Sequence, residues 1–94
     1  MTYGVRLDDA AIRDLERLSG GLRAVLFARI EALADDPRPA GAKRLTGELS
    51  GSYRLKVRQA YRIGFDVDDE ARTVTVWGIG HRDKFYEKAL RRRR

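Results

Sequence analysis

Residues able to act on a phosphodiester are concentrated in the second half of this chain. Residues 53–67 alternate apolar and polar side chains on both sides of Arg58-Gln59-Ala60, which predicts a β-hairpin with a three-residue loop. The apolar residues share one face, so Arg54, Lys56 and Arg62 share the other, with Lys56 opposite Arg62. Like charges in that position disfavour folding by about 0.2–1 kcal/mol. Stability does not explain this arrangement, whereas an anionic ligand would.

A second group of polar residues, His81, Arg82 and Tyr86, follows the last expected strand. Together with the basic hairpin face, such a set can bind a phosphodiester and stabilise the extra negative charge of its pentavalent transition state. With RNA as substrate the 2′-hydroxyl is a built-in nucleophile. Tyr86 and His81 are candidates for proton transfer or base stacking. Taken alone, His81 fits a structural histidine better than a catalytic one, and Arg54 and Lys56 fit ordinary solvent-facing positions equally well.

Several other kinds of chemistry lack the residues they need. The chain has one histidine and no cysteine, so neither a metal site nor a serine triad is expected, and no cofactor is implied. The absence of cysteine suits a reducing compartment. No apolar run approaches the ~20 residues of a membrane span, and the N-terminus lacks a signal-peptide core. We therefore expect a cytoplasmic protein with no membrane partner.

The positive charge is uneven along the chain. The net charge is +6; residues 1–46 carry eight basic and seven acidic side chains, and residues 47–94 carry twelve and seven. Sixteen of the twenty basic residues are arginine, whose planar fork suits phosphate and stacks on bases. Nucleic acid, or an acidic protein that mimics it, is the expected partner, although a GC-rich genome with a solvated tail would give a similar composition. The further basic residues expected to bind RNA are Lys43, Arg44, Arg58, Lys84, Arg91 and Arg92.

The periodicity of the sequence defines the elements that must position these groups. In chain order it predicts a strand over residues 2–7, a helix after Asp8-Asp9 that ends at Gly20-Gly21, a helix over 22–34, a loop over 41–45, the hairpin, a strand over 72–80 and a helix over 83–91. The first helix should bury Ile12, Leu15 and Leu18. Apolar residues of both parities in 72–80 fit a central strand covered on both sides, with Trp77 in the core.

These elements indicate an α+β fold in one domain over residues 1–94. An N-terminal strand and an antiparallel helical hairpin pack on one face of a mainly antiparallel, twisted sheet of four or five strands, followed by a short C-terminal helix. The helices are expected on one side of the sheet. Residues 68–70 are predicted to form a solvated acidic turn, and residues 91–94 a frayed cationic tail.

Four segments together resemble the RelE/ParE superfamily of bacterial and archaeal type II toxins. They are L-x-G-x-L-x-G-x-Y-R at 45–54, K-V-R-x-x-Y-R-I-x-F at 56–65, D-D-E-A-R-T-V-T-V at 68–76 and G-H-R-D-K-F-Y at 80–86. The opening strand and helical hairpin also fit, so the resemblance covers nearly the whole chain.

The resemblance implies a toxin neutralised by a cognate antitoxin whose acidic, partly disordered segment wraps the basic surface. RelE-like members cleave mRNA in the ribosomal A site by attack of the 2′-hydroxyl on the adjacent phosphate. The cations of that group match Arg54, Lys56, Arg62 and Arg82, and its late tyrosine matches Tyr86. ParE-like relatives share the scaffold but act on DNA gyrase. A third alternative is an inactive relative that retains only antitoxin binding.

Overall fold

The structure, a computed structural model, describes residues 2–93 and confirms the α+β class. The elements are β1 (Gly4–Leu7), α1 (Asp9–Glu16), α2 (Gly20–Ala32), β2 (Ala42–Arg44), the 3-10 turn η1 (Gly47–Leu49), β3 (Tyr53–Val57), β4 (Tyr61–Asp68), β5 (Thr73–His81) and α3 (Arg82–Arg93). The predicted loop over residues 41–45 is wrong in part, because residues 42–44 pair with β3 as a short edge strand.

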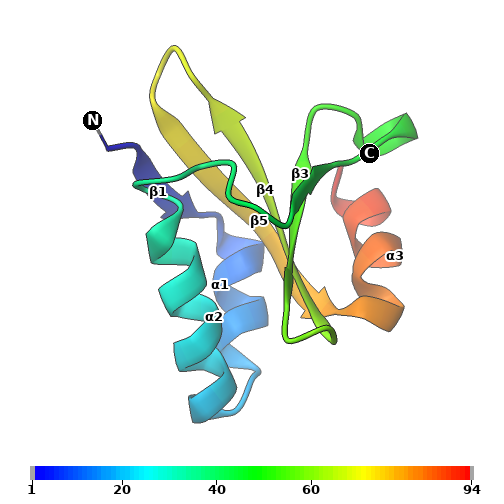
Figure 1. The fold of residues 1–94 in the computed structure, drawn as a ribbon. Helices are drawn as coiled ribbons and strands as arrows, with labels where there is room; N and C mark the ends of the chain where they lie inside the picture. The colour runs from blue at the N-terminus through cyan, green and yellow to red at the C-terminus, as the bar shows by residue number, and fades with distance from the viewer. Residues whose placement is uncertain (1, 94) are drawn as a thin grey trace.

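The five strands form one sheet in the order β1-β5-β4-β3-β2. Every neighbouring pair is antiparallel except β1 and β5, which are parallel. Helices α1 and α2 lie on one side of the sheet and α3 on the other (Figure 1). The expectation that all helices share one side is therefore wrong, since the cluster around Trp77 gives α3 its own apolar surface on the second face.

The first two helices form largely as predicted. Asp8 caps α1, and its side chain accepts a hydrogen bond from the Ala11 N–H at 2.9 Å. Leu15 is buried, but Ile12 is 41% exposed, so its predicted burial is wrong. Ala11 takes that place on the inner side of the helix. Gly20-Gly21 does not end α1, which stops at Glu16, but forms the start of α2.

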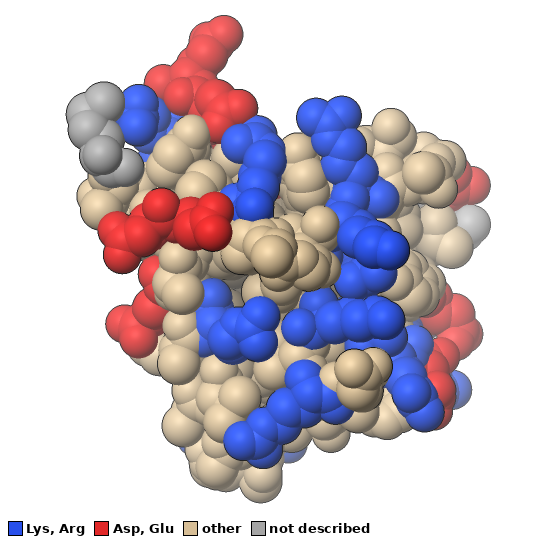
Figure 2. Space-filling model, viewed as in Figure 1, with Lys and Arg blue, Asp and Glu red and all other residues tan. Residues whose placement is uncertain are grey.

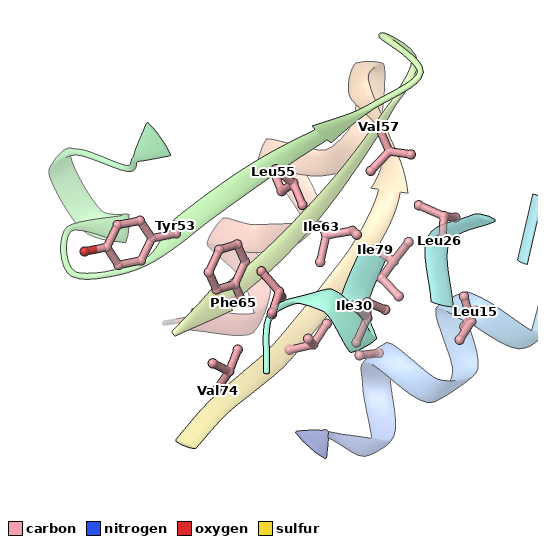
Figure 3. Close-up of a cluster of buried hydrophobic side chains, with 13 residues drawn as sticks. Leu15, Leu26, Ile30, Tyr53, Leu55, Val57, Ile63, Phe65, Val74 and Ile79 are labelled. Atoms are coloured by element: carbon pink, nitrogen blue, oxygen red, sulfur yellow. The ribbon is translucent and has the colours of Figure 1, made fainter. Parts of the chain in front are cut away.

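The main core lies between the α1–α2 pair and the sheet. Leu26 and Ile30 of α2 point towards Leu55 and Ile63 of the hairpin and Ile79 of β5 (Figure 3). Each of these five side chains is at most 1% exposed. Burying aliphatic side chains of this size gives about 1.5–3 kcal/mol each, so this face is the main source of stability.

A β-bulge explains why both parities of β5 carry apolar residues. Gly64 pairs with Gly78 and Phe65 with Val76, so Trp77 is an extra residue between the two pairs. Val76 and Ile79 therefore face α1 and α2, while Trp77 packs on Phe85 and Ala89 of α3. The predictions that this strand is central, and that Trp77 is core, are confirmed.

The C-terminal helix is longer than predicted. It begins at Arg82, directly after β5, and continues to Arg93, so the expected frayed tail over residues 91–94 is wrong for residues 91–93; Arg94 lies outside the described residues. Phe85 and Ala89 are fully buried, as predicted. None of the helices within residues 2–93 is long and apolar enough to cross a lipid bilayer.

Candidate nucleic-acid interface

The hairpin has the predicted register. Lys56 pairs with Arg62 and Val57 with Tyr61 across the three-residue loop. Leu55, Val57 and Ile63 belong to the core under α1 and α2. Because neighbouring residues of a strand point to opposite faces, Arg54, Lys56 and Arg62 lie on the face that carries α3. We call these three residues the cationic row.

Two members of the cationic row are buried. Arg54 is 9% exposed and donates from Nη1 to Gly41 O at 3.3 Å. Arg62 is 8% exposed and donates from Nη1 to Gln59 O at 2.6 Å and Tyr61 O at 3.1 Å. Neither takes part in any ion pair found within the described part of the chain, and Arg62 Nε has no acceptor there. Burying a charge without a counter-ion costs folding free energy. This arrangement is therefore typical of a site that binds an anion.

Lysines extend this surface towards solvent. Lys56 is exposed in the middle of the row. Lys43 of β2 pairs with Arg54, so its side chain lies on the same face of the sheet. In space-filling view, Lys and Arg gather over the middle of the molecule, between the α1–α2 pair and α3, while Asp and Glu lie mainly towards the margins (Figure 2).

Helix α3 adds two groups to this side of the molecule. Arg82 and Tyr86 are four residues apart and therefore lie on the same side of the helix. The Arg82 N–H donates to Ala60 O at 2.7 Å, next to the carbonyl of Gln59 that holds Arg62. The start of α3 is thereby tied to the hairpin loop beside the cationic row. Arg82 has a weak ion pair with its neighbour Asp83 at 3.8 Å, and Tyr86 is 40% exposed with its ring edge-on to Phe85.

His81 does not share the face of the cationic row. It pairs with Tyr61, which places it on the opposite side of the sheet, where the two rings meet edge-on with centroids 5.5 Å apart. Its Nδ1 accepts the Asp83 N–H at 3.2 Å. The histidine therefore caps the start of α3, in agreement with its structural reading.

Two of the six further basic residues expected to bind RNA are held by other groups. Arg44 pairs with Tyr53, so it lies on the α1–α2 side, where its Nε donates to the Tyr53 hydroxyl at 3.2 Å. Arg38 also donates to that hydroxyl, and this bond, followed by that from Arg44, lowers the pKa of Tyr53. Arg92 forms a two-pronged bond with Asp14. We therefore leave Arg44 and Arg92 out of the interface.

The other residues of that group differ in position. Arg58 is exposed in the hairpin loop, next to the cationic row, and has a φ of 50°. Lys84 and Arg91 are also exposed, but they follow the side of α3 that carries Lys88, about half a turn away from Tyr86. Lys43 and Arg58 are thus the two that border the cationic row.

A buried acid near this helix was missed in the sequence. Asp14 lies on the inner side of α1 between Ala11 and Leu15, and its side chain is 1% exposed. Burial raises the pKa of Asp14, but hydrogen bonds from Arg92, the Ile79 N–H and Lys88 outweigh that effect, and the pKa is lowered overall. The signal for it in the sequence was an acidic residue on the apolar side of a predicted helix.

The acidic turn over residues 68–70 is exposed to solvent, as predicted, and its Asp69 also bonds to other segments. Asp69 accepts two hydrogen bonds from Arg38, at 3.1 and 2.9 Å, and one from the Tyr3 hydroxyl at 2.6 Å. These bonds link three segments of the chain.

No group of three or more His, Cys, Asp or Glu side chains suited to a metal ion occurs among residues 2–93.

Comparison with known proteins identifies the family. Residues 5–86 match the family of the ParE toxin of the type II toxin-antitoxin system parDE. The chain is 35% identical to toxin RelG of Mycobacterium tuberculosis over 94% of its length and 100% of that protein. It is 28% identical to the Escherichia coli mRNA interferase toxin RelE, over 98% of each chain.

A solved structure agrees with these matches. The toxin–antitoxin complex RelBE2 of M. tuberculosis contains a chain that superposes with a TM-score of 0.78 at 31% identity, covering 87% of this chain and 100% of that one. The fold, the family match and the level of identity lead to one conclusion. The chain belongs to the RelE/ParE family of type II toxin–antitoxin toxins.

Proposed function

We propose that this toxin is a metal-independent, ribosome-dependent endonuclease that cleaves mRNA. The observation that carries the proposal is the pair of buried, unpaired guanidinium groups of Arg54 and Arg62 beside exposed Lys56. Groups placed in this way serve an external anion better than they serve the fold. The name of the E. coli relative, an mRNA interferase toxin, supports RNA as that anion.

In the proposed reaction the RNA supplies its own nucleophile. The 2′-oxygen attacks the adjacent phosphorus and the bond from phosphorus to the 5′-oxygen breaks, leaving a 2′,3′-cyclic phosphate and a 5′-hydroxyl. The 2′-hydroxyl loses its proton to a base, and the leaving 5′-oxygen gains one. Arg54, Lys56, Arg62 and Arg82 hold the phosphate and stabilise the added negative charge. Such stabilisation needs no metal ion.

We assign proton transfer or base stacking to Tyr86 rather than to His81. Tyr86 shares its side of α3 with Arg82, whereas His81 lies on the opposite face of the sheet with its Nδ1 occupied by the Asp83 N–H. Lys43 and Arg58 border the cationic row and extend the contact along the RNA backbone. In the ribosome the A site would present the message to this surface.

The partner in the resting cell is proposed to be a cognate antitoxin with an acidic segment. The similar M. tuberculosis structure is a toxin–antitoxin complex. An acidic segment over the cationic row would supply the counter-ions that Arg54 and Arg62 lack. Its affinity should fall with rising salt, because exposed charge contacts are screened.

Mapping transcript ends in cells that express the protein tests the proposal. We expect new ends within translated messages for wild type, none for Lys56→Ala, and wild-type ends for Arg29→Ala, a change of an exposed arginine on α2. Lys56 is exposed, so its truncation should not disturb folding. Intact messages in cells shown by immunoblot to contain the wild-type toxin would overturn the nuclease.

Gyrase inhibition is the second function to test, because the family match over residues 5–86 carries the ParE name. It predicts supercoiling defects and a DNA-damage response while messages stay whole. An inactive relative would cause no growth arrest. The same cultures distinguish all three outcomes when plasmid topology and growth are measured beside transcript ends.

A further inference from the structure

One edge of β5 changes its partner halfway along the strand. Residues 73–76 pair with β1, but β1 ends at Leu7, so in the described part of the chain no strand lies beside residues 77–81 on that edge. Backbone groups of a strand edge need partners. Here the partners are three charged side chains from two helices, namely Asp14 of α1 and Lys88 and Arg92 of α3.

Asp14 is the centre of this arrangement. Its Oδ2 accepts the Ile79 N–H at 2.9 Å and Arg92 Nη1 at 2.6 Å. Its Oδ1 accepts Lys88 Nζ at 3.1 Å and Arg92 Nη2 at 2.9 Å. The two cations then donate to the strand itself, Lys88 to Ile79 O at 3.0 Å and Arg92 to Trp77 O at 3.1 Å. One buried carboxylate thus joins α1, the edge of β5 and two successive turns of α3.

Glycines in β5 make room for the two cations. A Cβ at Gly78 would lie 3.2 Å from Arg92 Nη1, and a Cβ at Gly80 would lie 3.2 Å from Lys88 Nζ. These distances are shorter than ordinary van der Waals contact, so larger residues at either position would push the cations away from the strand. The alternation of Gly78 and Gly80 therefore belongs to the same arrangement as Asp14.

The charged contacts of Lys88 and Arg92 restrict the movement of α3 relative to the sheet. The helix follows β5 without a linker, and the Arg82 N–H is tied to Ala60 O, so its start is fixed. The remaining motion is a swing about that end. Phe85 and Ala89 hold the helix by non-directional apolar contact, whereas the bonds of Lys88 and Arg92 to Asp14 set a direction.

We propose that Asp14 is a positioning residue that fixes the swing of α3 and so sets Tyr86 relative to the cationic row. This inference rests on the proposed nuclease function for its effect on catalysis, but not for its effect on the helix. A small displacement of a group that acts on the reacting atoms lowers the rate strongly, by about 100-fold for 1 Å in well-ordered sites. Asp14 itself touches no substrate.

The test compares Asp14→Asn with Leu26→Ala. Leu26 of α2 is fully buried against the sheet, so its truncation lowers the unfolding temperature but leaves the contacts of α3 intact. Amide hydrogen exchange is measured for α3 relative to β4. The only tryptophan, Trp77, stacks on Phe85 with ring centroids 5.6 Å apart, so its fluorescence reports the docking of α3 independently.

We expect Asp14→Asn to speed exchange in α3 relative to β4 by at least about tenfold, and to change Trp77 fluorescence. In cleavage assays it should lower kcat by about 10–100-fold with KM nearly unchanged. Leu26→Ala, assayed well below its unfolding temperature, should leave both the exchange ratio and kcat as in wild type. If Asp14→Asn fails to fold, Lys88→Gln, which leaves Arg92 on Asp14, should give a smaller change in the same direction.

Two results would overturn the inference. One is an unchanged exchange ratio in Asp14→Asn, and the other is a fall in kcat for Leu26→Ala that matches the fall for Asp14→Asn. A wild-type protein that cleaves no RNA would refute the nuclease and the catalytic part of this inference. Exchange and fluorescence would still decide whether Asp14 fixes α3.

Discussion

Charged side chains differ in burial and pairing between the two faces of the sheet. On the side of α1 and α2 the core cluster is apolar, the buried Asp14 of α1 is paired with Lys88 and Arg92, and Arg44 at the margin is exposed and bonded to Tyr53. On the face under α3, Arg54 and Arg62 are buried, and within residues 2–93 their hydrogen bonds go to backbone carbonyls. Burial normally accompanies pairing, since an unpaired buried charge costs several kcal/mol.

Under the proposed function, this difference separates the part of the molecule that holds the fold from the part that binds a ligand. The α1–α2 face supplies stability through packing. The α3 face would give up some stability to keep two guanidinium groups ready for an anion, which is expected of a preorganised site. Two changes on the α3 side of the sheet, one in the Asp14 network that joins α1 to α3 and one on the α1–α2 side test this division.

The largest effect is expected from replacing both buried guanidinium groups, in Arg54→Met/Arg62→Met. Cleavage should fall by at least about 10³-fold, since one lost transition-state donor typically costs 10²–10³. The free energy of unfolding should stay the same or rise, because two unpaired buried charges are removed. Urea denaturation and cleavage assays measure the two quantities, with Arg29→Met as the control. Parallel loss of stability and activity would assign both arginines to the fold instead.

Next in size is the effect of Asp14→Asn on stability. Removing one partner of a buried ionic network costs about 3–5 kcal/mol. The pKa of Asp14 is lowered in the folded state, so the stability due to its ionised form is present above the unfolded pKa of about 3.9 and is lost as pH falls through the lower folded pKa. The difference between wild type and variant should therefore be constant above about pH 5 and shrink in acid. Urea titrations at a series of pH values measure it.

A control for that experiment is Asp9→Asn, which changes an exposed carboxylate in the first turn of the same helix. It should cost well under 1 kcal/mol, because charge effects at an exposed helix end are about 0.3–1 kcal/mol. If the two variants lost equal stability, the network around Asp14 would contribute nothing beyond the general charge of α1.

A smaller effect is expected from Gly64→Ala. A Cβ at Gly64 would lie 2.5 Å from the ring of Trp77, so the indole must move and disturb the packing of Phe85. Overpacking of this kind costs about 1–3 kcal/mol. Gly21→Ala is the matched control, since a Cβ there meets nothing within 4 Å. Thermal unfolding of both variants measures the difference, and equal stability would mean that the Trp77 ring adapts freely.

The sequence predicts the hairpin and its register because two signals agree. The alternation of apolar and polar residues defines the face of each side chain, and the three-residue loop keeps both apolar rows on the same face. It does not assign the faces of β5, because the bulge at Gly64/Phe65 shifts parity at one residue, and the resulting apolar residues of both parities fit an unbulged strand covered on both sides equally well. The start of α2 is also misread, since Gly20-Gly21 is typical of a helix end, yet the helix begins there. Local signals thus define strands better than irregularities within them.

The candidate site likewise has features that the sequence predicts and features that it does not. Parity alone places Arg54, Lys56 and Arg62 on one face, because that depends only on position along two paired strands. Parity also argues against His81, but only once the register of β4 with β5 is known. The bond between Arg92 and Asp14 joins residues far apart in sequence, so no local pattern predicts it. No local pattern predicts the burial of Arg62 either.

The smallest effect belongs to the other face of the sheet. The hydrogen bond from Arg38 is the main cause that lowers the pKa of Tyr53, so Arg38→Gln should raise that pKa towards its ordinary value of about 10. Arg38 and Tyr53 lie away from the cationic row, on the α1–α2 side of the sheet, so cleavage should change less than about twofold, as expected for groups remote from the chemistry. Tyrosine titration by NMR, with Tyr53→Phe for assignment, measures the shift. A large loss of cleavage in Arg38→Gln would mean that the RNA also contacts the α1–α2 side, and the division between the two faces would fail.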